Sequence, residues 1–220
     1  RREGKTEVKA KYAAMVESVD DAVGTIADAL EAHGLTGQTL IIFTSDNGGL
    51  IGPTDNTPLR SGKGFAYEGG IRVPLIVKWP GVVLPGSVSS VPVTSVDLFP
   101  TIADATGTSS QDAELLDGQS LVPILRDPSI GPTSRSLYWH FPHYRHAPGP
   151  YGIVRDGHWK LIQWYEGGHE LYQLKDDLGE TKNLANELPD RVKLMQAKLD
   201  AELSRVGAKE PRVNPAFQAD

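Results

Sequence analysis

The chain has 220 residues, of which 39% are hydrophobic and 23% charged, and its formal net charge is −6. This composition is typical of a folded globular protein, and the scattering of the basic residues argues against a nucleic-acid partner. No apolar run approaches the roughly 18 residues of a membrane span, which excludes a transmembrane segment. Cysteine is absent, so this stretch of sequence contains no disulfide and no thiolate nucleophile.

The first predicted elements are a helix and two strands. Apolar residues recur at steps of three and four over residues 12–30, which predicts an amphipathic helix that ends at Gly34. Residues 39–44 are apolar on both faces, which predicts a buried strand of a parallel sheet. A second strand of this sheet is expected over residues 73–79. The order of helix and buried strand indicates an α/β architecture.

A long segment rich in Gly, Thr and Pro, residues 45–72, separates the two predicted strands. Loops of this length in compact domains are usually functional. A short helix is then expected over residues 97–106, with Asp97 as its cap and Gly107 after its end. Another apolar patch covers residues 121–125.

The pattern changes in the last third of the chain. Residues 151–155 and 158–164 flank the turn Asp156-Gly157, which predicts a β-hairpin, and residues 170–174 would add a third strand. Pro189 would open a helix whose apolar residues cover one face of this antiparallel sheet. We therefore predict two domains, residues 1–128 and a small α+β subdomain over residues 129–220.

The predicted first domain has too few strands. A parallel sheet needs several strands with both faces covered, and residues 1–128 supply only two candidates. We therefore expect that these residues are the C-terminal part of a larger α/β domain, whose N-terminal half precedes Arg1.

Asp46 and Asn47 directly follow the first predicted strand, in the run Ser-Asp-Asn-Gly-Gly. Open α/β sheets bind ligands at the carboxyl ends of their strands. Adjacent Asp and Asn oxygens suit Ca²⁺ or Mg²⁺, and zinc is disfavoured without cysteine or a histidine pair. Because the same residues also favour ordinary turns, a purely structural turn is the alternative interpretation.

Lys63 stands between two glycines, which would let its positive charge approach an anionic oxygen closely. The alternative is a solvated loop lysine. Glu68 and Arg72 follow four residues apart, and we expect them to form an ion pair that shapes the loop.

His140 and His143 lie in the Pro-rich segment between the two predicted domains. A substrate cleft is a common feature of such boundaries, so both histidines are candidates for substrate contact or for proton donation to a leaving oxygen. Packing or a surface position is the alternative for each of them.

Several segments taken in order resemble the sulfatase family of the alkaline phosphatase superfamily. They are TLIIFTSDNGG, PLRSGKGFAYEGGIRVPLIVKWPG, VTSVDLFPTIADATG, LDGQSLVPIL, VRDGHWKLI and HELYQLKDDLGETKNLAN. The resemblance extends from Tyr12 to about Leu203. It implies a partial alkaline-phosphatase-like parallel-sheet sandwich, followed by the small C-terminal subdomain with its antiparallel sheet and terminal helix.

The resemblance also implies roles for individual residues. Asp46 and Asn47 match two ligands of the family's active-site Ca²⁺, with Mg²⁺ the less favoured ion. Lys63 matches the catalytic lysine that contacts the substrate sulfate. The implied reaction is hydrolysis of a sulfate ester by a hydrated formylglycine, and the implied partner is a sulfated small molecule or glycan. A periplasmic or secreted location is implied as well.

The sequence departs from the family in one large respect. The Cys-x-Pro-x-Arg or Ser-x-Pro-x-Arg motif that is converted to formylglycine is absent, and so are the family's early aspartate ligands, so we expect these 220 residues alone to be inactive. Two alternatives to a sulfuric ester hydrolase remain. One is a phosphonate or phosphate ester hydrolase of the same superfamily, and the other is a non-catalytic module that binds sulfated glycans.

Overall fold

The computed structural model describes residues 7–108, 116–131 and 135–212. They form two compact units, each made from two stretches of chain. One unit takes the described parts of residues 1–45 and 74–133, and the other takes residues 46–73 together with the described residues from 135 onward. The loop that carries Asp46 and Lys63 thus belongs to the same unit as the C-terminal sheet, whereas its place in the sequence suggested the first domain. The predicted boundary at residues 128 and 129 stays a prediction.

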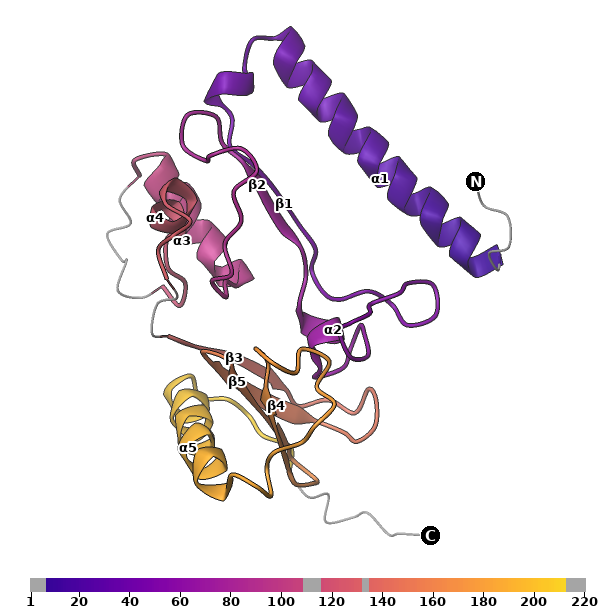
Figure 1. The fold of residues 1–220 in the computed structure, drawn as a ribbon, viewed down its shortest axis with the longest axis vertical. Helices are drawn as coiled ribbons and strands as arrows, with labels where there is room; N and C mark the ends of the chain where they lie inside the picture. Colours follow the sequence, from indigo (N-terminus) through magenta and orange to yellow (C-terminus); the bar gives the residue numbers. More distant parts are fainter. Residues whose placement is uncertain (1–6, 109–115, 132–134, 213–220) are drawn as a thin grey trace. The chain divides into compact units, whose positions relative to one another are not determined.

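The first unit opens with α1, Glu7–Ala32, which confirms the predicted amphipathic helix (Figure 1). The helix ends in a turn in which Gly34 has φ +66°, a left-handed conformation that glycine adopts without strain. Its apolar face is exposed, however: Met15 is 66% and Ile26 60% exposed. Among the described residues, no helix combines the length and the apolar character needed to cross a membrane.

Strands β1, Ile41–Thr44, and β2, Leu75–Lys78, lie close to their predicted positions. They pair antiparallel, with Thr44 opposite Leu75, so the expected parallel pairing of these two strands is wrong. Parallel neighbours need a connection that crosses the sheet to its other end, and the intervening loop returns the chain to the end that it left. The predicted burial of the first strand is also wrong, because Phe43 is 38% exposed.

The described residues of the first unit also include the short helices η2, Ser95–Asp97, α3, Leu98–Ala105, and α4, Val122–Arg126. A further one-turn helix, η1, covers Thr36–Gln38. Asp97 was predicted to cap the helix, but it precedes α3 without a side-chain cap hydrogen bond, and it is instead the capping-box partner of Thr94 at the start of η2. Its buried carboxylate accepts hydrogen bonds from the backbone amides of Thr94 and Gln119, both at 2.9 Å.

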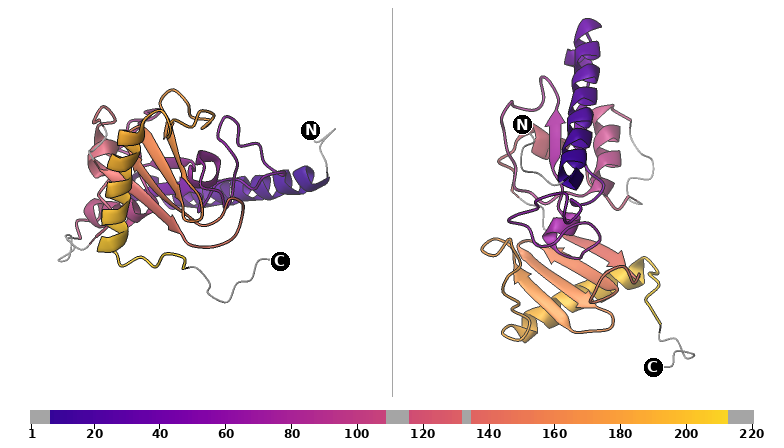
Figure 2. Two further views of the ribbon diagram at one scale, coloured as in Figure 1. Left: turned by 90° about the horizontal axis from the view of Figure 1, so that it is seen from below. Right: turned by 90° about the vertical axis from the view of Figure 1, so that its right-hand side faces the viewer.

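The second unit is built on a four-stranded antiparallel meander in the order β3-β4-β5-β6. The strands are β3, Ser136–Phe141, β4, Tyr151–Asp156, β5, Trp159–Trp164, and β6, His169–Gln173. The predicted hairpin and third strand are confirmed, and β3 is an additional strand. Helix α5, Pro189–Arg205, crosses one face of the sheet, as Figure 2 shows.

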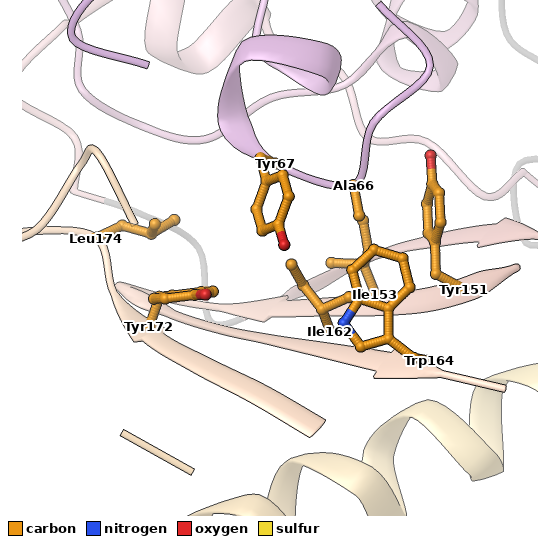
Figure 3. Packing of buried hydrophobic residues seen from close by; sticks show 8 residues of the cluster. All are labelled: Ala66, Tyr67, Tyr151, Ile153, Ile162, Trp164, Tyr172 and Leu174. Atoms are coloured by element: carbon orange, nitrogen blue, oxygen red, sulfur yellow. The ribbon is translucent and has the colours of Figure 1, made fainter. Parts of the chain in front are cut away.

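Both faces of this sheet are covered. On one face, Met195 and Leu199 of α5 are fully buried and pack in a cluster with Leu161. On the other face, Ala66 and Tyr67 pack onto a second cluster that the sheet supplies (Figure 3). The sheet residues of that second cluster are Tyr151, Ile153, Ile162, Trp164, Tyr172 and the adjoining Leu174. The loop that follows Lys63 is therefore part of the hydrophobic core of the second unit.

Candidate functional site

The first candidate residues, Asp46 and Asn47, open the loop that follows β1. Asp46 is exposed and Asn47 is half-buried. The backbone amide of Asn47 donates to Asp46 Oδ1 at 2.9 Å, and Asn47 Nδ2 donates to the carbonyl of Gly48 at 3.1 Å. These local hydrogen bonds fix the turn and leave both side chains at the surface of the unit.

Gly48 allows this turn to pack closely against the segment from Glu68 to Ile71, the one-turn helix α2. The Gly48 amide donates to the carbonyl of Gly70 at 2.9 Å. A Cβ at Gly48 would lie 1.8 Å from the carbonyl oxygen of Gly69, so any side chain would push the two segments apart. Glycine is therefore required here by contact with backbone, which does not move aside as a side chain does.

The backbone of Lys63 is hydrogen-bonded to the same turn. Its backbone amide donates to the carbonyl of Gly49 at 2.9 Å. Asn56 strengthens this junction, because its Nδ2 donates both to the Gly49 carbonyl and to the Ser61 carbonyl, each at 2.9 Å. The structure thus brings the loop of Asp46 and Asn47 together with the loop of Lys63. Sequence reasoning missed Asn56.

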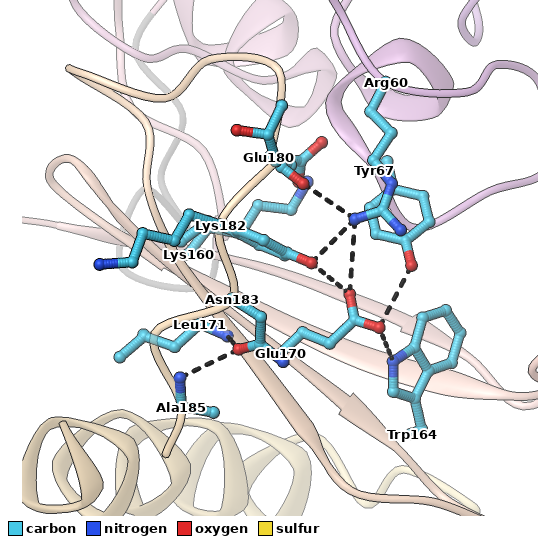
Figure 4. A network of polar contacts seen from close by, with 12 residues as sticks. Arg60, Tyr67, Lys160, Trp164, Glu170, Leu171, Glu180, Lys182, Asn183 and Ala185 are labelled. Atoms are coloured by element: carbon cyan, nitrogen blue, oxygen red, sulfur yellow. Dashed lines mark hydrogen bonds and ion pairs between the residues drawn. The ribbon is translucent and has the colours of Figure 1, made fainter. Parts of the chain in front are cut away.

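Arg60 holds the start of the Lys63 loop on the C-terminal sheet, as Figure 4 shows. Its guanidinium lies 3.7 Å from the centre of the Tyr67 ring and donates to the hydroxyl of Tyr172 at 2.8 Å. It also donates to the carbonyl of Glu180 at 2.9 Å. Burial, together with the nearby Glu170 carboxylate, raises the pKa of Tyr67 to about 12, so its hydroxyl stays protonated and donates to Glu170.

A buried ion cluster anchors α2 on the sheet. The Nζ atom of Lys160 lies 3.0 Å from a carboxylate oxygen of Glu68 and 2.8 Å from one of Glu180. Glu180 also accepts the backbone amide of Glu68 at 2.7 Å. All three side chains are at most 1% exposed. The predicted pair of Glu68 with Arg72 is confirmed at 3.6 Å, and Arg155 lies 3.8 Å from the same carboxylate.

The two candidate histidines differ in their surroundings. Both ring nitrogens of His140 have partners inside the chain: Nδ1 lies 2.7 Å from the hydroxyl of Tyr165, and Nε2 lies 3.1 Å from the carbonyl of Lys209. His143 is exposed and packs edge-on against Phe141, with ring centres 5.1 Å apart. Contact of either histidine with a substrate stays a prediction, and the geometry favours His143.

A shallow hollow lies beside the residues that follow Lys63. Its lining comes from that loop, from the connection between β3 and β4, and from the sheet, and comprises Gly64, Phe65, Ala66, Phe141, His143, His146, Ala147, Gly149, Tyr151 and Trp164. The rings of Phe65 and His146 stack with centres 4.3 Å apart and planes only 3° from parallel. Nothing in the spacing of the sequence pointed to His146.

The oxygen donors of Asp46 and Asn47 fit a hard cation such as Ca²⁺, which takes six to eight oxygen ligands. Within the described residues, no group of three or more acidic or histidine side chains is placed to hold a metal ion. Asp46 and Asn47 therefore supply the right kind of ligand but not a full coordination sphere.

Comparison with known proteins gives two matches to family sequence profiles. The profile described as Sulfatase matches residues 1–108, and the profile described as N-sulphoglucosamine sulphohydrolase, C-terminal, matches residues 61–209. A protein of Formosa agariphila named Sulfatase is 42% identical over 209 residues, which are 83% of this chain and 36% of that protein. The chain thus spans about a third of the length of this relative.

Solved structures show the same relationship. The crystal structure of Ps i-CgsB in complex with k-i-k-neocarrahexaose matches with a TM-score of 0.79 and 29% identity over 90% of this chain and 44% of that one. The structure of BT4656 in complex with its substrate D-glucosamine-2-N,6-O-disulfate matches with a TM-score of 0.70 and 27% identity, over 89% and 40% of the two chains. These matches confirm the expected alkaline-phosphatase-like fold class. The chain belongs to the sulfatase family of the alkaline phosphatase superfamily.

Proposed function

We propose that this chain is part of a sulfuric ester hydrolase and contributes a portion of its calcium and sulfate-binding site. In this proposal Asp46 and Asn47 bind Ca²⁺, and Lys63 binds the sulfate group as the catalytic lysine of this portion. The observation that carries the proposal is the junction at Gly49. Its carbonyl accepts hydrogen bonds from the Lys63 amide and from Asn56, which holds the metal-ligand loop beside the lysine loop.

The chemistry expected of these residues is charge stabilisation. Bound calcium would supply positive charge at the sulfuryl oxygens. Lys63 is exposed, and in the described part of the chain its ammonium group forms no ion pair, so it is available to an anion. Fixed positive charge aimed at oxygens that gain charge during the reaction lowers the barrier without any reorganisation at that moment. The formylglycine nucleophile is expected outside these 220 residues, which contain no cysteine.

The bound molecules of the solved neighbours support a sulfated saccharide as the substrate class, since one neighbour holds a disulfated glucosamine that is called its substrate. A periplasmic or secreted location belongs to the same proposal. His143 lines the hollow beside Gly64 and is the better placed of the two histidines to contact the saccharide.

The test is sulfate release by the whole protein of which this chain is part, assayed with an aryl sulfate and with sulfated disaccharides. We expect Lys63→Ala to lower kcat/KM about a hundredfold or more, as expected when one stabiliser of transition-state charge is removed. Chelation of calcium should abolish turnover. The matched control is Lys175→Ala, another exposed lysine of the same unit, which should leave the rate unchanged.

Three results would overturn the proposal. Release of phosphate from phosphate or phosphonate esters, without sulfate release, would favour the related ester hydrolase. Calcium-dependent binding of sulfated glycans without any turnover would indicate a non-catalytic module. Full activity of the Lys63→Ala variant would remove Lys63 from the site.

A further inference from the structure

Three basic residues lie at or beside Gly64. Lys63 precedes it in the chain, and Arg145 and His146 reach it from the connection between β3 and β4. A Cβ built on Gly64 would lie 2.8 Å from both Arg145 Nε and His146 Nε2, so these nitrogens face one point and lie within twice that distance of each other. Gly64 also has φ +88°. Only glycine combines that backbone conformation with room for both side chains.

Carboxylates do not pair with Arg145 or His146 in the described part of the chain. The side chains of Arg145 and His146 form neither an ion pair nor a hydrogen bond there, and both are exposed. Glu166 contacts the same connection, and its carboxylate accepts a hydrogen bond from the hydroxyl of Tyr144. Lys160 of the same unit, by contrast, lies against two carboxylates. The guanidinium of Arg145, unpaired among the described residues and close to the loop of Lys63, favours an anionic ligand group.

The stacked rings of Phe65 and His146 lie at the shallow hollow next to these side chains. Tyr151 and Trp164 line the same hollow. Tyr151 and Trp164 are buried in the core, so they support the connection between β3 and β4 from below. A ligand would therefore meet Arg145 and His146 at the surface, beside the loop of Lys63.

We propose that Arg145 and His146 form a second anion subsite, adjoining the sulfate site at Lys63, which selects saccharides that carry at least two anionic groups. The second group is a sulfate ester or a carboxylate, because the guanidinium of arginine matches the oxygens of either. This inference rests on the proposed function, since Lys63 must hold the sulfate that is cleaved. Arg145 and His146 are specificity residues in this scheme and take no part in the bond-breaking step.

The test compares three substrates in the whole protein: an aryl monosulfate, a disulfated disaccharide and a monosulfated disaccharide that contains a uronate. Arg145→Gln and His146→Gln should each raise KM for a doubly anionic substrate about tenfold, the effect of losing one charge-assisted hydrogen bond. Neither variant should change kcat/KM for the aryl monosulfate. The matched controls are Arg126→Gln and His158→Gln, which replace exposed residues of the same types.

Two further readouts separate a binding role from a structural one. KM for the doubly anionic substrate should rise with ionic strength, and this dependence should weaken in Arg145→Gln, because salt screens exposed charges. The second readout is calorimetric binding of the disulfated disaccharide, which does not depend on turnover. The dissociation constant should rise about tenfold in Arg145→Gln. The disaccharide whose KM responds to the variant identifies the second group as sulfate or carboxylate.

The failures of the two proposals are distinguishable. If the wild-type protein releases no sulfate from any of the substrates, the proposed function is wrong, and the calorimetric comparison still decides whether the anion subsite exists. If sulfate is released but Arg145→Gln affects the aryl and the doubly anionic substrates equally, or affects neither, the subsite is wrong.

Discussion

Helices α1 and α5 carry the same kind of apolar stripe but differ completely in burial. Leu199 of α5 is fully buried against the sheet, whereas Val19 of α1 is 52% exposed among the described residues. Both stripes follow the helical repeat in the sequence. Apolar spacing thus determines which face of a helix is suited to burial. Whether that face is buried depends on whether the rest of the fold places a partner against it.

The same contrast applies to the two sheets. The C-terminal meander has a hydrophobic cluster on each face, and its second cluster includes Ala66 and Tyr67 from the loop that carries Lys63. The pair β1 and β2 leaves Phe43 and Ile76 exposed, at 38% and 61%. The candidate site residues therefore lie on the better packed of the two units, where the C-terminal sheet holds their loop.

The largest effect on stability is expected when the anchoring of this loop on the C-terminal sheet is disrupted. Lys160→Met would leave the buried carboxylates of Glu68 and Glu180 without their shared ammonium group, and removal of one partner of a buried ion pair costs about 3–5 kcal/mol. We expect a loss of this size in the free energy of unfolding, measured by urea denaturation. Lys182→Met is the control, because Lys182 pairs with Glu187 at the surface. Its effect should stay within about 1 kcal/mol.

The two helices are compared directly by one substitution in each. Leu199→Ala should destabilise the 220-residue chain by about 2–5 kcal/mol, since it opens a cavity between α5 and the sheet. Val19→Ala in α1 should change stability by less than about 0.5 kcal/mol. Both values come from denaturant unfolding followed by circular dichroism. Equal losses in the two variants would contradict the exposed face of α1.

Local patterns predicted much of the fold correctly. The hairpin at Asp156-Gly157 and the helix that opens at Pro189 need only neighbouring residues to be recognised. Strand direction in the first unit was not predictable in this way. A strand that is apolar on both faces is suited to burial on both faces. The direction of the neighbouring strand depends on the end of the first strand to which residues 45–73 bring the chain back.

The candidate site was likewise predictable only in part. Asp46, Asn47 and Lys63 stand in short motifs that were visible in the sequence, and the pair of Glu68 with Arg72 follows from their spacing. Glu180 was not predictable, because it meets Glu68 across 112 residues of chain. His146 was missed for the same physical reason, since its partner Phe65 lies in a distant loop. Asn56 was missed because its partners Gly49 and Ser61 are in the same loop, where no periodic pattern connects the residues.

An intermediate effect is expected at Asn56, where the metal-ligand loop meets the lysine loop. Asn56→Ala removes an amide that serves the carbonyls of Gly49 and Ser61 and should lower stability by about 1–2 kcal/mol. Asn56→Asp keeps the shape but turns a carboxylate toward two carbonyl oxygens, so its loss should be larger. Thermal unfolding of both variants measures this order. A more stable Asp variant would contradict the assigned hydrogen bonds.

The smallest expected effect concerns the pH dependence of the buried cluster. Burial raises the pKa of Glu180 above its ordinary value, and the ammonium of Lys160 offsets this only in part. Because the pKa of Glu180 is higher in the folded state than in the unfolded state, the native state binds more protons than the unfolded state at pH values between these two pKa values. The contribution of Glu180 to stability is therefore fully present below the unfolded pKa of about 4.5 and is lost as the pH rises through the folded pKa.

Glu180→Gln removes this titration while it preserves an oxygen that can accept the amide of Glu68. The stability of the wild-type chain relative to Glu180→Gln should consequently decrease from pH 4 to pH 7. The measurement is the free energy of unfolding of both chains at these two pH values. An increase over the same interval would mean that Lys160 lowers the pKa of Glu180 in the folded state, and that the ion pair outweighs the cost of burying the carboxylate.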